Sequence, residues 1–411
     1  MELKINYQYT YFIYPFAIKT EKYKRYILGL LKNEKYELQF FDGFKDVDLY
    51  NYFIPSIKEN IFQDFTFSKE KIATFYKLSS SNQYKELLKQ NCLMFNYQME
   101  EMQGKTEEKD GIFFQIQKIQ LVCFKTGICF LLLKTHIEET DKFSDLLNFN
   151  YKFGNIHLET KSLKKLNRIK IQTDAFSSMN YLSEMIHEIT GQKIKSKELE
   201  IDENLFLTYG YACIDSSFWN KDEDFQNIQN EFVKFSNLYP SNTNVNVDYE
   251  KLTMFTNTSY MKLRMNSKGS FLICSSTDSH NYTNLPHLYE RQYLYTYIMA
   301  LHQRYYLKKI SKELGKKQGK RKALKQFIEF TKEIWINEVT MESLGQKMYQ
   351  RCKETMNLDT LYQEAKSKYD VFYKEKNIER SNRISCITIV LVMIAIILAL
   401  ENLATILFYN T

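Results

Sequence analysis

Small and polar side chains recur every three or four residues near the carboxyl end of the chain, in a run that is otherwise Ile, Leu and Val. A helix brings positions with this spacing onto one face. On a membrane helix, such a face marks either contact between helices or the lining of a pore. One helix cannot enclose a path, so a pore requires several copies of the chain; chance composition is the alternative explanation. The face comprises Ser385, Thr388, Val392, Ala395, Ala399 and Asn402.

Glu401 stands beside Asn402 near the far end of this run. A carboxylate in a membrane helix is costly unless it is paired, hydrated or at the interface. Glu401 follows Ile384 by a helical rise of about 26 Å, which places it near the outer edge of the hydrocarbon. It either marks the boundary with the outer headgroups, or in a symmetric assembly forms a ring of carboxylates at the outer mouth that attracts cations.

No catalytic constellation is recognisable elsewhere in the sequence. The segment Gly315–Arg321 resembles a phosphate-binding loop, but its glycines are too close together and no Ser or Thr follows its lysine. His187-Glu188 lacks the second histidine of a zinc-protease motif, and His280 and His287 have no nearby cysteine. We therefore expect a protein that is not an enzyme and holds no metal, and the sequence indicates no cofactor.

A basic segment joins two of the predicted helices. Nine Lys and Arg residues fall between Lys308 and Lys325, against one acid, Glu313. The simplest interpretation is a solvated loop. The alternative is a set of cations facing lipid phosphates, or a port for an anionic ligand. The formal net charge of the whole chain is +7, which suits a membrane-facing surface and does not require nucleic acid.

The element that must position the small-residue face is the C-terminal apolar run itself. From Ile384 to Leu400 this run is interrupted only by two hydroxyl residues and one cysteine, and further apolar residues extend it to Phe408. About 20 apolar residues span the hydrocarbon core of a bilayer. We therefore predict one transmembrane helix over 384–408, because buried core helices seldom reach this length without charge.

The residues that flank the run predict its orientation. Lys374, Lys376, Arg380 and Arg383 precede it, and neither Lys nor Arg follows it in the sequence. The positive-inside rule then places the N-terminal body in the cytoplasm and the C-terminus outside the inner (plasma) membrane. The seven cysteines are scattered and form no C-x-x-C pair, which fits reduced thiols in a cytosolic body.

Proline usage divides the chain into two parts. After Pro286 no proline occurs for 125 residues. We expect a cytosolic α+β or α/β domain over 1–285, an all-helical stalk region over 286–383 and the transmembrane helix over 384–408. Asp359 can cap a helix that runs unbroken from Thr360 to about Phe408, a rod of roughly 75 Å.

The clearest strand signal lies in the first part. Two β-rich runs flank Lys125-Thr126-Gly127, a pattern that predicts a hairpin. Met99–Gly111 and Ser241–Glu250 are rich in polar residues and are predicted to be loops.

A large α/β body, a long stalk helix and a membrane segment at the extreme C-terminus resemble the CorA superfamily of divalent-cation channels. The stretch ERSNRISCITIVLVMIAIILA, at Glu379–Ala399, is similar to the junction where that family's stalk helix enters a Thr- and Ile-rich first span. This chain departs from the family pattern in two respects. In place of the Gly-Met-Asn signature only Asn402 corresponds, and no second span follows.

The CRISPR-associated CorA-like proteins of type III systems, which also lack the signature, fit better. FKTGICFLLL, at Phe124–Leu133, and LYTYIMALHQRYYLKKIS, at Leu294–Ser311, are similar to segments of such proteins. The resemblance implies a homo-oligomeric membrane effector gated by a nucleotide second messenger, a conjugate of S-adenosylmethionine and AMP (SAM-AMP). Such an effector permeabilises the membrane in antiviral defence. Its partners would be itself, the bilayer and the small activator, with no direct contact to nucleic acid.

Two other functions are compatible with the sequence. A constitutive CorA-type channel would conduct divalent cations without any nucleotide. A tail-anchored interaction protein would use the helix only as a tether, so that poly-Leu could replace it.

Overall fold

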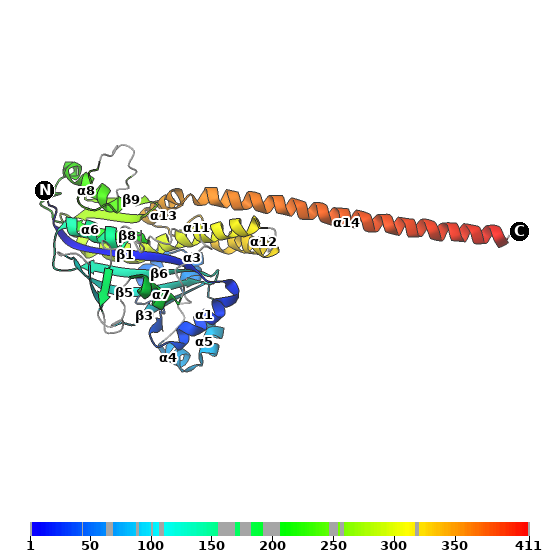
Figure 1. The fold of residues 1–411 in the computed structure, drawn as a ribbon, viewed down its shortest axis with the longest axis horizontal. Helices are drawn as coiled ribbons and strands as arrows, with labels where there is room; N and C mark the ends of the chain where they lie inside the picture. The colour runs from blue at the N-terminus through cyan, green and yellow to red at the C-terminus, as the bar shows by residue number, and fades with distance from the viewer. Residues whose placement is uncertain are drawn as a thin grey trace, which may run out of the picture.

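A computed structural model of the chain describes residues 2–42, 44–62, 69–87, 90–99, 102–106, 111–154, 169–172, 182–191, 206–245, 254, 259–316 and 320–409. A large sheet with helices packed on both faces forms the body, and one long helix projects from it (Figure 1). At this level the mixed α/β domain followed by helices agrees with the predicted fold class.

The strands of the main sheet lie in the order β2-β3-β5-β6-β1-β8-β10-β9, with β4 beside β5 and β7 beside β4. Among the described strands, the pairing is antiparallel except between β8 and β10, which run parallel. The strands are β1 (Ile5–Ala17), β2 (Tyr36–Leu38), β3 (Cys92–Tyr97), β4 (Met102–Thr106), β5 (Phe113–Phe124), β6 (Ile128–Ile137), β7 (Ile169–Gln172), β8 (Leu207–Ile214), β9 (Met261–Asn266) and β10 (Gly269–Ser275).

The central strand β1 explains why the sheet is covered on both sides. Tyr9 and Tyr11 belong to the core on one face, whereas Phe12 and Tyr14 belong to the core on the other. All four side chains are buried. Side chains alternate between the faces of a strand, so a strand with large apolar side chains on both faces needs cover on both sides.

The hairpin predicted around Lys125-Thr126-Gly127 is confirmed by the pairing of β5 with β6. Gly127 has a φ of 83°, a conformation that residues with a side chain rarely adopt. A Cβ added at Gly127 would lie 2.2 Å from the carbonyl oxygen of Ile18. The N–H of Ile18 in turn donates to the carbonyl oxygen of Gly127 at 2.7 Å. The tip of the hairpin is therefore fixed against the end of β1.

Helices from the first part of the chain cover one face of the sheet. Their apolar side chains join the inner residues of the strands in one hydrophobic core. The helices that contribute are α1 (Thr20–Lys32), α4 (Lys69–Lys77), α6 (Phe143–Phe153), α7 (Leu182–Thr190) and α8 (Phe225–Asn237), with α5 (Ser80–Glu86) packed against α1 and the 3₁₀ turn η3 (Asp222–Asp224) leading into α8.

The opposite face is covered mainly by helices from the second part of the chain. At their centre α11 (Leu294–Leu314) is buried over most of its length, as expected of a helix whose first turns have apolar and aromatic side chains on all sides. The helices around it are α2 (Val47–Tyr52), α3 (Pro55–Ile61), α9 (His280–Thr283), α10 (Leu285–Leu288), the π-helix η5 (Tyr289–Tyr293), α12 (Lys320–Glu329), the π-helix η6 (Phe330–Ile334) and α13 (Ser343–Thr355).

Buried tyrosine hydroxyls join these helices to the sheet. Tyr9 donates to the carbonyl oxygen of Pro286 at 2.8 Å, and Tyr209 donates to the carbonyl oxygen of Tyr289 at 2.8 Å. The region 286–383, which the sequence indicated as a stalk, therefore has two parts. The helices up to α13 share a core with the sheet, because α11 buries apolar residues all round, and only the last helix projects.

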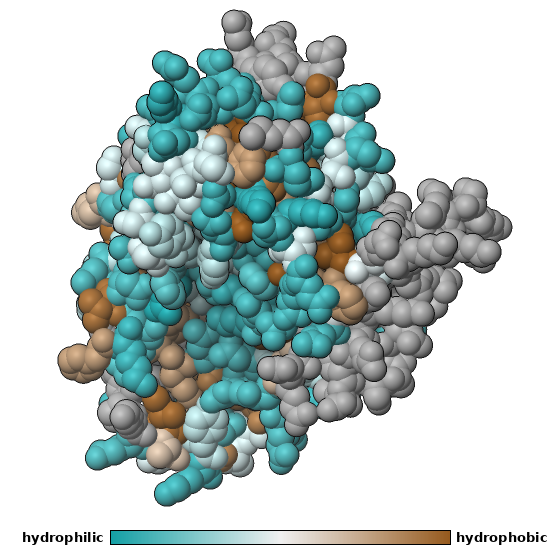
Figure 2. Space-filling model, turned by 90° about the vertical axis from the view of Figure 1, so that its left-hand side faces the viewer, coloured by the Kyte–Doolittle hydropathy of each residue, from teal (hydrophilic) through white to brown (hydrophobic). Residues whose placement is uncertain are grey.

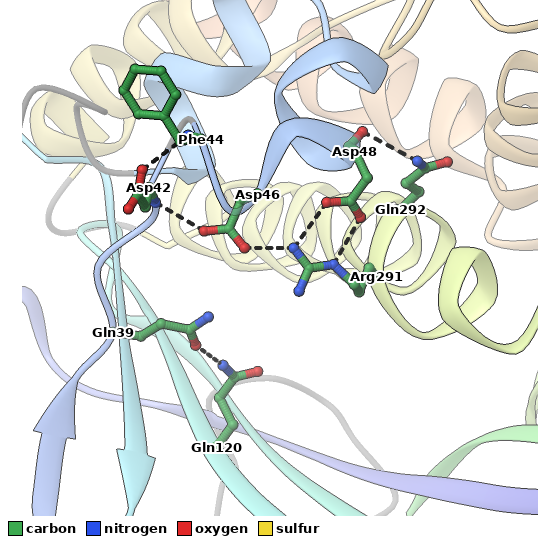
Figure 3. Close-up of polar contacts among 8 residues, drawn as sticks. All are labelled: Gln39, Asp42, Phe44, Asp46, Asp48, Gln120, Arg291 and Gln292. Carbon is green, nitrogen blue, oxygen red and sulfur yellow. Dashed lines mark hydrogen bonds and ion pairs between the residues drawn. The ribbon is translucent and has the colours of Figure 1, made fainter. Parts of the chain in front are cut away.

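An ion-pair cluster attaches α2 to η5 (Figure 3). Arg291 donates from Nη2 to Asp46 at 2.5 Å, and from Nε and Nη2 to the two carboxylate oxygens of Asp48 at 2.8 and 3.0 Å. Gln292 donates to the backbone carbonyl oxygen of Asp48 at 3.2 Å. The two-oxygen contact with Asp48 fixes the orientation of the guanidinium as well as its position.

The last helix, α14 (Leu358–Tyr409), is continuous, which confirms the unbroken helix expected from the absence of Gly and Pro. Leu358 and Ala365 are fully buried against the body, and the ring of Tyr369 lies 5.1 Å from that of Phe327. Beyond these turns the helix leaves the body and extends into open space (Figure 1). Its 52 residues span about 78 Å, similar to the length that the sequence predicted.

One predicted loop is wrong in part. Met99–Gly111 contains the strand β4, which pairs with both β5 and β7. A Cβ added at Gly104 of β4 would lie 2.1 Å from the ring of Phe114, so close pairing rather than local propensity makes this segment a strand. In Ser241–Glu250, residues 241–245 form neither helix nor strand, in agreement with the prediction, and 246–250 lie outside the described residues.

The end of the body farthest from α14 has a mainly hydrophilic surface. Figure 2 shows this end, where hydrophilic residues predominate and hydrophobic residues are scattered among them. This surface fits contact with water. The exposed apolar surface of the molecule is instead concentrated on α14.

Candidate functional site

The predicted contact face lies on the projecting part of α14. Between Ile384 and Leu400, the Ile, Leu, Val and Met side chains are each 49–60% exposed. In the most apolar stretch of the helix no described residue is buried within the body. The helix is long and apolar enough to cross a membrane.

The continuous helix brings the six predicted residues onto one side. At 100° per residue they fall within a sector of about 100° and extend over about 26 Å of helix. The hydroxyl of Thr388 donates to the carbonyl oxygen of Ile384 at 3.0 Å, so this polar group is satisfied within its own helix. All six residues are exposed: Ser385, Thr388, Val392, Ala395, Ala399 and Asn402.

Glu401 does not share this face. Helical rotation places it about 150° from the middle of the face, on the same side as Ile394 and Ile397. In a straight helix, the small-residue face and Glu401 therefore cannot line the same pore. Glu401 and Asn402, which the sequence placed together at the outer mouth, therefore lie on different sides of the helix. Asn402 belongs to the small-residue face, and Glu401 belongs to the opposite, Ile-rich side.

A cavity of about 360 Å³ lies where the tip of the β5–β6 hairpin meets α11 and η6. Phe124, Lys125 and Thr126 line it from the hairpin, and the remaining lining residues come mostly from α11, α12 and η6. Pockets that bind small molecules range from about 300 to 1,000 Å³. One wall is built by a π-helix, a geometry that is frequent at functional sites.

His302 of α11 forms part of the cavity wall. Its ring stacks on Phe124 with centroids 3.8 Å apart, and its Nε2 lies 2.9 Å from the hydroxyl of Thr126. Burial, together with the nearby Lys309 ammonium, lowers the pKa of His302 to about 3. At neutral pH the wall therefore presents a neutral imidazole, which can donate or accept one hydrogen bond at each nitrogen according to its tautomer.

Two glutamine side chains line the cavity, and they differ in whether their hydrogen-bonding groups have partners. Gln303 donates to the carbonyl oxygen of Ile334 at 2.9 Å and accepts from the hydroxyl of Tyr349 at 2.9 Å. Gln326 is buried, and its Oε1 has no hydrogen-bond partner within the described part of the chain. A buried acceptor of this kind normally has a partner, so Gln326 offers a binding position to a donor inside the cavity.

The charged residues of the lining are predominantly acidic. Glu329 and Glu333 contribute carboxylates from α12 and η6, against the single ammonium of Lys125. Phe124 and Tyr306 add aromatic rings. The cavity therefore suits a flat ligand whose groups at this wall are neutral or positively charged and rich in hydrogen-bond donors.

The cavity wall also contacts α14. Ile334 and Ile336 line the cavity, and Trp335 between them turns outward to stack on Tyr362 of α14, with ring centroids 4.5 Å apart and planes at 17°. Lys353 lies 5.1 Å from the centre of the Trp335 ring. A displacement of the backbone at 334–336 would therefore move the Trp335 ring, which contacts the base of the projecting helix.

The motifs rejected from the sequence do not form a site in the described regions. Gly315–Arg321 joins α11 to α12 rather than following a strand, and its residues 317–319 lie outside the description. His280 and His287 lie in α9 and α10. Among the described residues, no group of three or more His, Cys, Asp or Glu side chains is arranged to hold a metal ion. The seven cysteines are free thiols.

The cavity itself was not predicted from the sequence. Thr126 and His302, which are in direct contact, stand 176 residues apart in the chain. Their contact depends on α11 packing across the sheet, which no local pattern reveals. The available signal was a histidine in the first half of α11, which is mostly aliphatic and aromatic, a position where burial would keep the ring neutral.

Comparisons with protein-family models, with curated proteins and with solved structures find no match to this chain.

Proposed function

We propose that the protein is a membrane-anchored sensor whose α14 crosses the bilayer and whose copies assemble into a pore controlled by a small ligand. The ligand binds in the cavity between the β5–β6 hairpin, α11 and η6. Its binding changes the angle at which α14 leaves the body, and the assembled helices open or close a path for ions. In keeping with the resemblance to CRISPR-associated CorA-like proteins, the ligand is a nucleotide messenger such as SAM-AMP, and the outcome is membrane permeabilisation in antiviral defence.

The single observation that carries the proposal is the exposed apolar half of α14. Ile, Leu, Val and Met side chains are exposed on all sides of this half of the helix. An apolar surface of this extent is unfavourable in water and requires a bilayer or a partner to cover it. Its length and composition match the hydrocarbon core of a bilayer. The small residues on one side then support contact between copies, while the opposite side, with Ile394 and Ile397, faces lipid.

The position of the cavity supports control by a ligand. A ligand shifts an equilibrium only by the difference in its affinity for the two states. The cavity can provide that difference, because Ile334 and Ile336 line it and Trp335 stacks on Tyr362 at the base of α14. A ligand that displaces this segment would bind the displaced state more tightly and would thereby stabilise a different position of the helix.

The chemistry of the lining supports recognition of a base or a sugar. Aromatic rings can stack on a heterocycle, and the free Oε1 of Gln326 can accept from an amine or a hydroxyl. With Glu329 and Glu333 in the lining, phosphates of the ligand would have to point away from this wall. We propose the orientation in which the body is cytoplasmic, because four basic residues lie directly before the apolar run, on the side of the body.

A second candidate function is a tail-anchored protein whose helix serves only as a tether. The position of Glu401 favours it, since a carboxylate on the side opposite the small-residue face does not contribute to a shared pore. In that case a poly-Leu segment in place of 384–400 would preserve activity.

The experiment combines ligand binding with ion flux on the full-length protein. Purified protein is first screened by thermal shift against nucleotides, because a ligand that binds only the folded state raises its melting temperature. A nucleotide that raises it is then added to vesicles that contain the protein, and ion flux is measured. We expect nucleotide-dependent flux, which Gln326→Met reduces and Lys332→Met, at an exposed position of η6, does not. Flux without nucleotide would favour a constitutive channel, and no flux in either condition would favour the tether.

A further inference from the structure

The free end of the α11–α12 hairpin has a strongly basic surface. Five exposed cations lie on the described residues at this end, two on α11 and its C-terminal extension and three on α12. The neighbouring acids are fewer: Glu313 follows Lys312 in α11, Glu21 lies 3.9 Å from Lys322, and Glu329 lies 3.6 Å from Lys325. Both ion pairs are exposed and therefore weak. The five cations are Lys312, Lys316, Arg321, Lys322 and Lys325.

Contacts with α14 show how far this hairpin extends along the projecting helix. Ser311 donates to Glu364 at 2.8 Å and accepts from Lys368 at 2.7 Å. On the other arm of the hairpin, the ring of Phe327 lies 5.1 Å from that of Tyr369. The basic end lies beyond both contacts, and in Figure 1 it extends farther along α14 than the rest of the body. It is therefore the part of the body nearest to the apolar half of α14.

Helical rise gives the remaining distance to a membrane. From the level of Phe372, about one turn past Tyr369, to Ile384 is about 18 Å along the helix. The headgroup region occupies roughly 5 to 8 Å of this distance, as half the difference between the total and hydrocarbon thicknesses of a bilayer. About 10 to 13 Å would then separate the basic end from the headgroups, somewhat more than one Debye length, which is roughly 8 Å at physiological salt. A typical tilt of the helix, about 20°, reduces the gap on one side.

The exposed part of α14 continues the basic surface across this gap. Between residues 374 and 383 it has four cations and two acids, and all six side chains are exposed. Helical rotation places three of these cations within about 40° of Tyr369, which faces the body, and Lys374 on the opposite side. We define the basic face as the five cations of the hairpin end together with these three of α14: Lys376, Arg380 and Arg383. The face runs from the hairpin to the start of the apolar run.

We infer that the basic face binds the headgroups of anionic phospholipids in the bilayer that α14 enters, and that this contact holds the body close to the membrane. The inference rests on the proposed function, because it requires α14 to be inserted. Each Lys or Arg near an anionic membrane surface contributes about 1 kcal/mol, equivalent to roughly a fivefold change in the ratio of docked to undocked bodies. Nucleic acid is the competing partner for a basic surface, but the position of the face beside the apolar run favours lipid.

The test measures the distance between the hairpin end and the headgroups in the full-length protein. Gly315→Cys places a thiol at this end, where an added Cβ makes only ordinary contacts, and Cys386→Ser removes the exposed native thiol. A fluorophore on the new cysteine is quenched by lipids that bear a nitroxide on the headgroup. The protein is reconstituted in nanodiscs of phosphatidylcholine alone, or of phosphatidylcholine mixed with phosphatidylglycerol.

We expect stronger quenching in the discs that contain phosphatidylglycerol, and loss of the difference at high salt. The double variant Arg321→Glu/Lys322→Glu should reduce the ratio of docked to undocked bodies by more than about tenfold, since two charges are reversed. The matched control Lys142→Glu/Lys221→Glu reverses two exposed lysines far from the hairpin end and should leave quenching unchanged. Equal melting temperatures of the two variants would show that neither has lost its fold.

Three results would overturn the inference. The first is equal quenching in the two kinds of disc, and the second is equal quenching of the wild type and the Arg321→Glu/Lys322→Glu variant. The third is binding of RNA that depends on Arg321 and Lys322 while quenching does not respond to lipid composition, which would assign the face to nucleic acid. Failure of the protein to insert in either disc is a different result, because it contradicts the proposed function itself.

Discussion

His302 shows how burial fixes the chemistry of a single side chain. The imidazole is stacked on Phe124 inside the protein, and burial with the nearby Lys309 lowers its pKa to about 3. An imidazole in the unfolded chain has a pKa of about 6.5. Between these two values the unfolded chain binds a proton that the folded chain does not, so stability contributed by His302 is present above about pH 6.5 and is lost as the pH falls.

The first prediction follows from this difference in protonation. Each pH unit below about 6.5 should reduce the free energy of unfolding by about 1.4 kcal/mol through His302, or by about 2 kcal/mol at pH 5. His302→Gln removes the titrating group but keeps a polar side chain near Thr126. Urea denaturation at pH 7 and pH 5 should therefore show a smaller loss of stability in the variant than in the wild type. Equal losses would mean that His302 is protonated in the folded protein at pH 5.

The second prediction concerns the turn of the hairpin. Gly127→Ala puts a side chain at a φ of 83° and brings its Cβ to 2.2 Å from the carbonyl oxygen of Ile18, so the free energy of unfolding should fall by at least about 2 kcal/mol. Gly29→Ala is the matched control. Gly29 lies in α1 with no atom within 4 Å of an added Cβ, and the change should stabilise the helix by about 0.5 to 1 kcal/mol. Urea denaturation of the two variants, compared at one pH, measures both effects.

The predictability of the site from sequence differs between its two parts. The face on α14 consists of residues three and four apart on one helix, so spacing alone was sufficient to predict it. The cavity brings Thr126 of a hairpin against His302 of α11, and only the packing of α11 across the sheet creates that contact. Glu401 was assigned to the outer mouth by its depth in the membrane, without regard to helical rotation, which places it on the opposite side of the helix.

At the scale of elements, α14 combines two kinds of surface in one continuous helix. Its first turns pack on α11 and α12, and its stretch from Ile384 to Leu400 is mostly apolar and exposed. The sequence predicted the continuity of this helix because no Gly or Pro interrupts it. It did not reveal how much of the region before α14 is packed on the sheet. The proline-free region looked like a separate stalk, yet the apolar and aromatic residues on all sides of the first turns of α11 were the signal that this helix is buried.

The third prediction tests the small-residue face of α14. Ala395→Leu and Ala399→Leu add bulk where helix backbones of neighbouring copies would approach closely, so cross-linked oligomers and ion flux should both decrease. Ile397→Leu changes a residue on the opposite side of the helix at nearly constant volume and should leave both unchanged. If all three variants give the same cross-linking and the same ion flux, the spacing of the small residues is due to chance composition.

The fourth prediction tests the contact between the cavity wall and α14. Trp335→Ala removes the ring that stacks on Tyr362, and the first turns of α14 should then open more often. We expect faster amide hydrogen exchange over residues 358–370, by about tenfold or more for a loss of roughly 2 kcal/mol. Exchange in β1, in the centre of the sheet, is the internal control and should not change. Unchanged exchange in α14 would exclude Trp335 as the link between cavity and helix.

At the scale of the whole molecule, the body and the projecting helix have different surfaces. The end of the body far from α14 is mainly hydrophilic, whereas the apolar surface is gathered on the far half of the helix (Figures 1 and 2). Such a separation suits a protein that keeps its body in water and its last helix in a bilayer. The overall division into a mixed α/β body and an apolar C-terminal helix was predicted from composition and periodicity, because both are properties of continuous segments. The order of the strands in the sheet depends on long-range pairing and was not predicted.

The fifth prediction concerns the central claim, that α14 carries the chain across the membrane with the body on the cytoplasmic side. One variant has an added cysteine after Thr411 and another has Phe44→Cys, at a side chain that is 96% exposed on the body; both carry Cys386→Ser. Cells are treated with a thiol reagent that cannot cross the plasma membrane, before and after lysis.

We expect the C-terminal cysteine to react in intact cells and the cysteine at position 44 to react only after lysis. Reaction at position 44 in intact cells would show that the body lies outside the cell, which is the opposite orientation. Protection of both cysteines until lysis would contradict the claim that α14 crosses the membrane.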